Sequence, residues 1–167
     1  MEKSEPSEVA EPMIPRVGHC LGMVKLGAYP SGHELLNQVV SFGRVIDKST
    51  AEVLAGIKVS PKEKTVALYA VTGQDLGIPE GAEYPLDRIY SLAHGHGLEV
   101  CSREVALLTS LHFNALKPAL IATSVVSTFN FCITGDKLVC YEVGDCSKIL
   151  FASYHMAIFA HSRPGHC

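Results

Sequence analysis

The chain has 167 residues, 47% of them hydrophobic and 19% charged, and a formal net charge of −3. This length and composition fit one ordinary globular domain. The slight negative charge excludes the basic surface that nucleic acid binding requires. No apolar run approaches the ~18 residues of a membrane-spanning helix. We therefore expect neither a nucleic acid partner nor a membrane partner.

The two ends of the chain differ in composition from its middle. Residues 1–15 contain Glu, Ser and Pro with few large apolar residues, which is typical of a flexible tail. They lack the apolar stretch of a secretion signal. We expect a single domain at 16–162, with an N-terminal tail at 1–15 and a C-terminal tail at 163–167. Without a secretion signal, the six cysteines are expected to be reduced thiols of a cytoplasmic protein.

The first elements of the domain are predicted to be a short strand at 20–26 and a helix. Ser31 and Glu34 have the spacing of a capping box, in which each side chain satisfies a free backbone N–H of the first turn. Gly43 is predicted to end this helix. Its buried face is expected to consist of Leu35, Leu36, Val39, Val40 and Phe42.

A second short helix and a strand are predicted next. Ser49 and Glu52 repeat the capping-box spacing, and Gly56 is expected to end that helix. Residues 65–72 are rich in β-branched and aromatic side chains. Their nearly continuous apolar character predicts a strand that is buried on both faces.

The strongest helix pattern in the sequence begins at Pro85. Proline suits a first helical position, because its missing N–H would have no intrahelical partner there. Gly95 and Gly97 are predicted to end the helix, since glycine accepts the left-handed conformation that follows a last turn. The positions with the spacing of one apolar helix face are Leu86, Ile89, Tyr90 and Ala93.

The end of this helix leads into the densest group of chemically reactive side chains. His94, His96, Cys101 and Glu104 are all residue types that zinc accepts as ligands. One hypothesis is therefore a zinc site formed by His94, His96 and Cys101, although the chain needs no cofactor to explain its pattern. The alternative is a helix end with two solvated histidines, because the sequence contains no C-x-x-C or H-x-x-x-H pair.

A second hypothesis for this group is nucleophilic catalysis by Cys101, with His96 or His94 as the base. A nearby cation or a helix N-terminus lowers the pKa of a thiol, and Arg103 lies two residues away. The alternative is an inert thiol in the core, which the apolar neighbours Leu98 and Val100 favour.

Residues 97–105 read Gly-Leu-Glu-Val-Cys-Ser-Arg-Glu-Val. This stretch resembles a G-L-E-L-C-x-x-E-V block in a group of small uncharacterised bacterial proteins, and the resemblance extends over about residues 31–113. Where those proteins have Pro before the Glu-Val pair and Gly-Pro after it, this chain has Ser102-Arg103 and Ala106-Leu107. The resemblance implies one domain in which helices precede strands. It implies no activity, because the function of the group is unknown.

The second half of the chain is predicted to be rich in strands. Residues 107–113 form a run too apolar for its period to distinguish helix from strand, and we predict a strand because β-like segments follow. The segments 129–134 and 137–143 flank Gly135-Asp136, a typical two-residue hairpin turn. Cys132 and Cys140 are expected to face each other across that hairpin. A last strand, or two strands with a bend, is predicted at 149–161.

The segment 119–128 is also predicted to be a strand. It carries no charge that would protect an exposed sheet edge. A homodimer formed through this strand is therefore one of the partner hypotheses.

This order of elements predicts an α+β domain, with short N-terminal helices and one central helix packed on one face of a mostly antiparallel sheet. Such folds host many functions. The leading functional hypothesis is a small, non-enzymatic binding or regulatory protein that acts through protein contacts. The alternative is a small metal- or cysteine-dependent hydrolase or transferase that uses the group at 94–104.

Overall fold

The structure, a computed structural model, describes residues 15, 17–79, 85–113, 119–123, 129–134, 137–142 and 156–162. Apart from Pro15, both expected tails lie outside the described residues. The described elements are β1 (His19–Leu26), α1 (Gly32–Ser41), β2 (Val45–Ile46), α2 (Lys48–Ala55), β3 (Lys64–Val71), α3 (Leu86–Gly95), α4 (Glu104–His112), β4 (Ala119–Ile121), β5 (Phe129–Thr134), β6 (Lys137–Glu142) and β7 (Met156–His161).

The described strands form one mixed, mostly antiparallel sheet in the order β1-β3-β7-β4-β5-β6-β2. The pairs β1–β3, β3–β7, β4–β5 and β5–β6 are antiparallel. The pairs β4–β7 and β2–β6 are parallel. The last described strand, β7, therefore lies between β3 and β4 and joins the two halves of the sheet. The predicted α+β class is confirmed.

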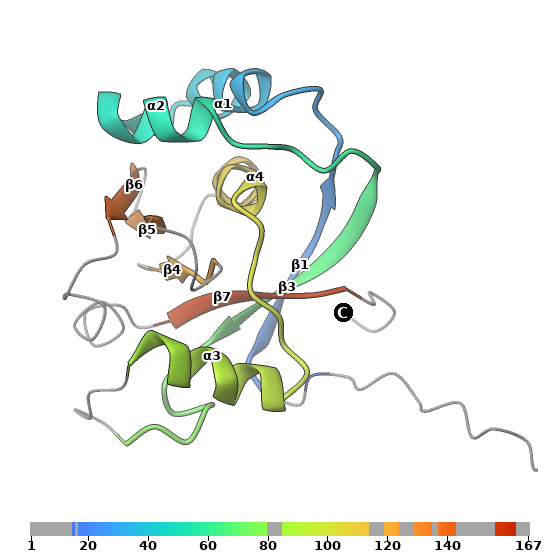
Figure 1. The fold of residues 1–167 in the computed structure, drawn as a ribbon, viewed down its shortest axis with the longest axis vertical. Coiled ribbons are helices and arrows are strands. Elements are labelled where there is room, and N and C mark those ends of the chain that lie inside the picture. The colour runs from blue at the N-terminus through green and yellow to red at the C-terminus, as the bar shows by residue number, and fades with distance from the viewer. Residues whose placement is uncertain are drawn as a thin grey trace, which may run out of the picture.

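Helices cover both faces of this sheet. Figure 1 shows α1, α2 and α4 on one side of the strands and α3 on the other. The two buried clusters follow this division along β3, because Val66 and Leu68 belong to the cluster on the α4 side, whereas Ala67 and Tyr69 belong to the cluster on the α3 side. The expectation of helices on a single face is therefore wrong. Burial on both faces of β3, however, is confirmed from Val66 to Val71.

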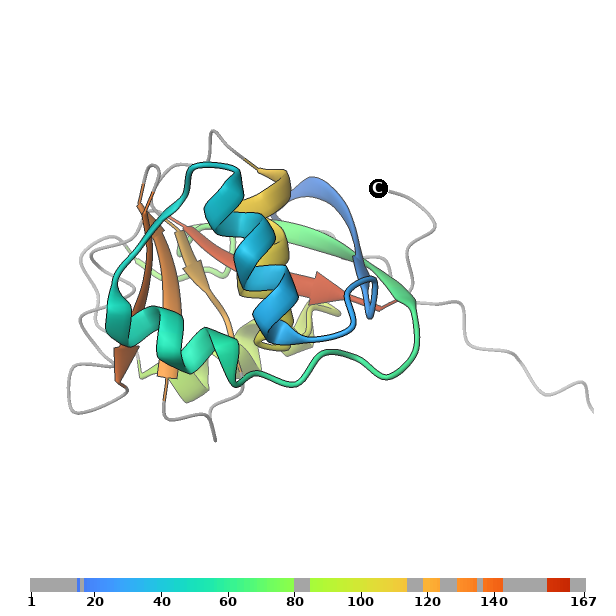
Figure 2. The same cartoon turned by 90° about the horizontal axis from the view of Figure 1, so that it is seen from above.

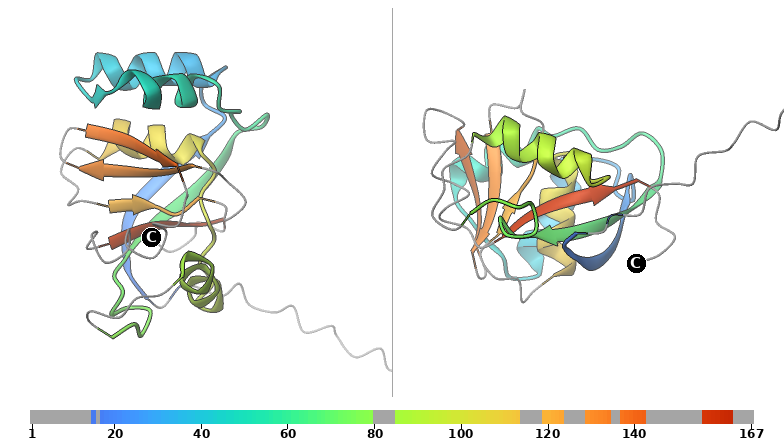
Figure 3. Two further views of the ribbon diagram at one scale, coloured as in Figure 1. Left: turned by 60° about the vertical axis from the view of Figure 1, so that its left-hand side comes forward. Right: turned by 90° about the horizontal axis from the view of Figure 1, so that it is seen from below.

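The buried centre of the domain is α4. Every residue from Glu104 to Leu111 is buried, and Figure 3 shows the helix enclosed between the sheet and the α1–α2 pair. The predicted strand at 107–113 is therefore wrong. A helix that is apolar on all sides has no amphipathic period, so the pattern that normally identifies a helix is absent here.

The α1 and α2 helices pack on each other and form an outer layer, in which α1 covers α4 and α2 packs on β6. Figure 2 shows this layer from above. The cap of α1 is confirmed, because Ser31 Oγ accepts a hydrogen bond from the N–H of Glu34 at 3.2 Å. The predicted cap of α2 is wrong. Asp47, not Ser49, is its N-cap and accepts from the N–H of Thr50 at 2.7 Å.

The strands of the second half follow the predicted order, with one change of position. Thr134 pairs with Lys137, so β5 and β6 form the predicted hairpin, whose turn lies outside the described residues. In the same register Cys132 pairs with Val139, not with Cys140. β4 lies between β7 and β5, so the predicted edge strand is an inner strand over its described residues.

Candidate functional site

The chain segment between α3 and α4 carries the residues that the sequence singles out for chemistry. His94 lies in the last turn of α3 and is exposed. His96 is the C-cap residue, half-buried, and its N–H donates to the carbonyl of Ala93 at 3.0 Å. Gly97 follows with φ +81°, the left-handed conformation predicted for the end of this helix.

Two short pairings fasten this segment to the sheet. Glu99 and Ala160 exchange two backbone hydrogen bonds, each 2.8 Å long. Two residues later, the N–H of Cys101 donates to the carbonyl of Ala122 at 2.5 Å. Because both ends of the stretch 99–101 are paired with inner strands, the backbone directs the side chain of Cys101 into the core.

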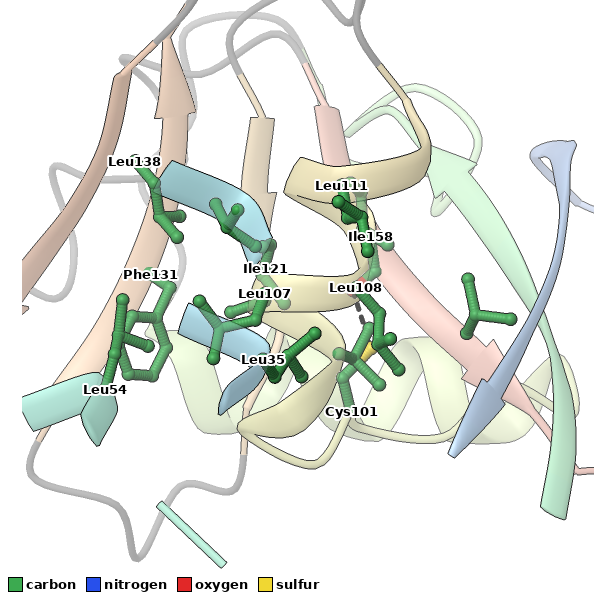
Figure 4. Close-up of a cluster of buried hydrophobic side chains, with 14 of the residues drawn as sticks. Leu35, Leu54, Cys101, Leu107, Leu108, Leu111, Ile121, Phe131, Leu138 and Ile158 are labelled. Atoms are coloured by element: carbon green, nitrogen blue, oxygen red, sulfur yellow. Dashed lines mark hydrogen bonds between the residues drawn. The ribbon is translucent and has the colours of Figure 1, made fainter. Parts of the chain in front are cut away.

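Cys101 is a free thiol and only 4% exposed. Its Sγ lies 3.4 Å from the carbonyl oxygen of Ile158, and Figure 4 shows it among leucine side chains of the cluster beside α4. Burial raises the pKa of the Cys101 thiol far above its ordinary value. A nucleophilic cysteine needs the opposite shift, so this geometry does not support catalysis by Cys101 with His96.

The structure does not bring the three predicted zinc ligands together. His94 is exposed to solvent, whereas Cys101 lies inside the core. Among the described residues, no group of three or more His, Cys, Asp or Glu side chains is placed to hold a metal ion. The fourth member of the predicted group, Glu104, has a different role.

Glu104 is 1% exposed and fastens two loops to the start of α4. Its Oε1 accepts from the N–H of Gly27 at 2.8 Å, and its Oε2 accepts from the N–H of Ser60 at 2.9 Å. Both carboxylate oxygens are therefore occupied by backbone donors. The role of Glu104 is to position the loops that follow β1 and α2.

His161 is a neighbour of this segment that the sequence did not connect to it. Its Nδ1 lies 3.1 Å from the carbonyl oxygen of Gly97, and its ring stands edge-on to Tyr69. A carbonyl only accepts, so Nδ1 carries the hydrogen of this contact. Ser162 donates a hydrogen bond to Glu99. The sequence placed His161 correctly on a strand, but only the β7 pairing brings it to the end of α3.

The oxidation state of Cys20 differs from the sequence prediction. Cys20, on β1, is disulfide-bonded. The expectation that all the cysteines are reduced thiols is therefore wrong.

Of the five exposed large apolar side chains among the described residues, three lie around the turn between α1 and β2. Phe42 is 67% exposed, and its neighbours Val40 and Val45 are 52% and 50% exposed. Hydrogen bonds from the N–H groups of Gly43 and Arg44 to the carbonyls of Val40 and Val39 close this turn. We call Val40, Phe42 and Val45 the α1–β2 corner.

Part of the predicted buried face of α1 is exposed and belongs to the α1–β2 corner. Leu35, Leu36 and Val39 are buried as expected. Val40 and Phe42 are exposed instead. Phe42 follows Ser41, the last residue of the helix, and Gly43 then turns the chain with φ +91°. The sequence places more large apolar residues at 35–42 than one face of so short a helix can bury. This excess is the signal that could have identified the corner.

Comparison with protein-family models, with curated proteins and with solved structures finds no match to this chain. The resemblance of residues 97–105 to small bacterial proteins therefore stays a prediction. Among the described residues, no helix is both long enough and apolar enough to cross a membrane.

Proposed function

We propose that this chain is a small, non-enzymatic binding protein and that the α1–β2 corner is its contact surface for another protein. The observation that carries the proposal is the 67% exposure of Phe42 between two half-exposed valines. A single exposed apolar residue is ordinary on a protein surface. Three large ones lie within six residues around one turn, and apolar side chains that are exposed close together often mark an interaction site.

The chemistry of the corner suits a protein partner. Aromatic side chains surrounded by smaller apolar contacts are the usual centres of binding energy in protein interfaces. Complete burial of a Phe side chain stabilises an interface by about 1.5–3 kcal/mol. The first residue of β6, Lys137, pairs with Val45 and is exposed. A charged residue at the border of an apolar contact is the usual rim of such an interface.

In the test, the wild-type chain and Phe42→Asp are each immobilised, and the proteins that bind to each of them are compared. A partner of the corner is retained by the wild type and lost with Phe42→Asp. Val100→Asp is the matched control, since Val100 is 39% exposed and lies on the segment between α3 and α4. This control keeps the partner. If Phe42→Asp and Val100→Asp retain the same proteins as the wild type, the corner is not a binding surface.

Stability must be measured alongside retention. Phe42 is mostly in solvent, so Phe42→Asp is expected to leave the melting temperature nearly unchanged. A partner lost together with the fold would say nothing about the corner. A partner lost from a folded variant supports the proposal.

A further inference from the structure

Among the described residues, the sheet ends at β1 on one side and at β2 on the other. β2 has two residues, whereas β1 has eight. The pairing of β1 with β3 shifts register between Cys20 and Gly22 and is regular from Gly22 to Leu26. This five-residue stretch, 22–26, is the longest run of continuous register on an open edge of the described sheet, and Gly22 begins it with φ +139°. We call it the β1 edge.

Natural proteins protect such edges with lysines, bulges or covering segments. The β1 edge has a bulge at one end and one lysine, Lys25. The Nζ of Lys25, however, lies 2.6 Å from the carboxylate of Glu63, and both side chains are more than half exposed. The repulsive charge of the lysine is therefore compensated within its own chain. Met23, in the same stretch, is 54% exposed and apolar.

We propose that the β1 edge pairs with the β1 edge of a second copy of this chain, antiparallel and around a two-fold axis at Val24. Val24 is the middle residue of the regular stretch, so this register uses all five residues. It sets Gly22 opposite Leu26 of the other copy. It also sets Met23 opposite Lys25 of the other copy, on the face that carries the Lys25–Glu63 pair.

Two features favour a second copy as the occupant. An antiparallel edge on a two-fold axis is self-complementary, because each outward N–H of one copy meets a carbonyl of the other. The alkyl stem of Lys25 offers Met23 an apolar surface, while its ammonium group stays with Glu63. Five residues bury less than the roughly 800 Å² per partner of a stable interface. The dimer is therefore weak and depends on protein concentration.

Sedimentation velocity on the full chain, without reductant so that the Cys20 disulfide stays intact, tests this proposal. The concentration series runs from about 10 µM to about 1 mM, where weak interfaces associate. The wild type is expected to sediment increasingly as a dimer along the series. A wild type that stays monomeric at the highest concentration would overturn the proposal.

Two opposite charges at one position test the register. Met23→Lys places two ammonium groups opposite each other across the interface and is expected to abolish the dimer. Met23→Glu places a carboxylate opposite Lys25 and is expected to keep the dimer and make it more sensitive to salt. The proposal is wrong if both variants dimerise equally or if both fail to dimerise.

A third variant tests the charge of Lys25 without any substitution in β1. Glu63→Gln removes the compensating charge of Lys25 and is expected to weaken the dimer, because the two lysines then repel each other. Unchanged association of Glu63→Gln would count against the proposal. Phe42→Lys is expected to dimerise as the wild type does, since the α1–β2 corner is a separate surface. Loss of the dimer in Phe42→Lys would place the self-contact at the corner and overturn the β1 edge.

Discussion

The side chains of Glu104 and Arg44 form hydrogen bonds at opposite ends of the same buried helix, α4. The partners of both side chains are backbone groups. The carboxylate of Glu104, in the first turn of α4, accepts from two loops that are 77 and 44 residues away in sequence. At the other end, Arg44 is 8% exposed and donates to the carbonyls of Ser110 and Phe113 at 2.7 and 2.8 Å. A negative group at the start of a helix and a positive group at its end both complement the helix dipole.

The first prediction concerns the buried carboxylate. Glu104→Gln replaces one accepting oxygen by an NH₂ group, which would face the N–H of Gly27 or of Ser60. Because a buried backbone donor is left without an acceptor, we expect the free energy of unfolding to fall by about 1–3 kcal/mol. Urea denaturation measures the loss. Glu52→Gln, at an exposed position of α2, is the control and should change stability by less than about 0.5 kcal/mol.

The second prediction separates two costs of adding a methyl group to a glycine. Gly27 and Gly43 both have positive φ, +74° and +91°. A Cβ at Gly27 would lie 2.7 Å from the carbonyl oxygen of Lys62, whereas a Cβ at Gly43 would have nothing within 4 Å. Gly43→Ala is expected to lose about 1–2 kcal/mol from the left-handed conformation alone. Gly27→Ala is expected to lose clearly more, and equal melting temperatures for the two variants would contradict the close approach.

The third prediction concerns the reactivity of Cys101. Burial raises the pKa of its thiol and also blocks the approach of reagents. We expect Cys101 to remain unmodified by iodoacetamide in the folded protein and to react fully after unfolding in urea. Peptide mapping by mass spectrometry isolates this cysteine from the other five. Rapid modification in the folded state would show that the core opens at the start of α4.

The fourth prediction is a pH dependence at the cap of α2. The N–H of Thr50 lowers the pKa of the Asp47 carboxyl below its ordinary value of 3.8, and the hydroxyl of Ser49 adds to this effect. A group whose pKa is lowered by folding stabilises the fold above its unfolded pKa and loses that contribution as the pH falls through its folded pKa. The melting temperature of Asp47→Ala should therefore lie below that of the wild type at neutral pH. The gap should shrink in strong acid, and a gap that does not change with pH would argue against an ionised cap.

The sequence was a good guide where one side of an element faces water. The N-cap at Ser31 and the glycine after α3 are local signals, and the structure confirms both. The same holds for the β5–β6 hairpin, whose two strands are separated by two residues. Each of these features depends on residues that are close in sequence.

Three of the failures involve neighbours that are distant in sequence. α4 was predicted to be a strand because a helix buried on all sides loses its period. The segment 119–128 was considered as an exposed edge for a homodimer, but β7 and β5 pair with the two sides of its described strand, β4. The residues of β4 contain no signal for these two partners. Glu104 was grouped with zinc ligands because its residue type fits, whereas its actual partners are the backbone N–H groups of Gly27 and Ser60.

The position of β7 has a consequence for how the chain reaches its fold during synthesis. This strand is the last described in sequence, yet it fills the gap between β3 and β4. Until residues 156–161 leave the ribosome, β1 with β3 and β4 with β5 and β6 remain two separate half-sheets. Each half presents an unpaired inner strand that can aggregate with other chains. The sheet can therefore close only after β7 has been synthesised, and a nascent chain stalled before Met156 should depend on chaperones to remain soluble.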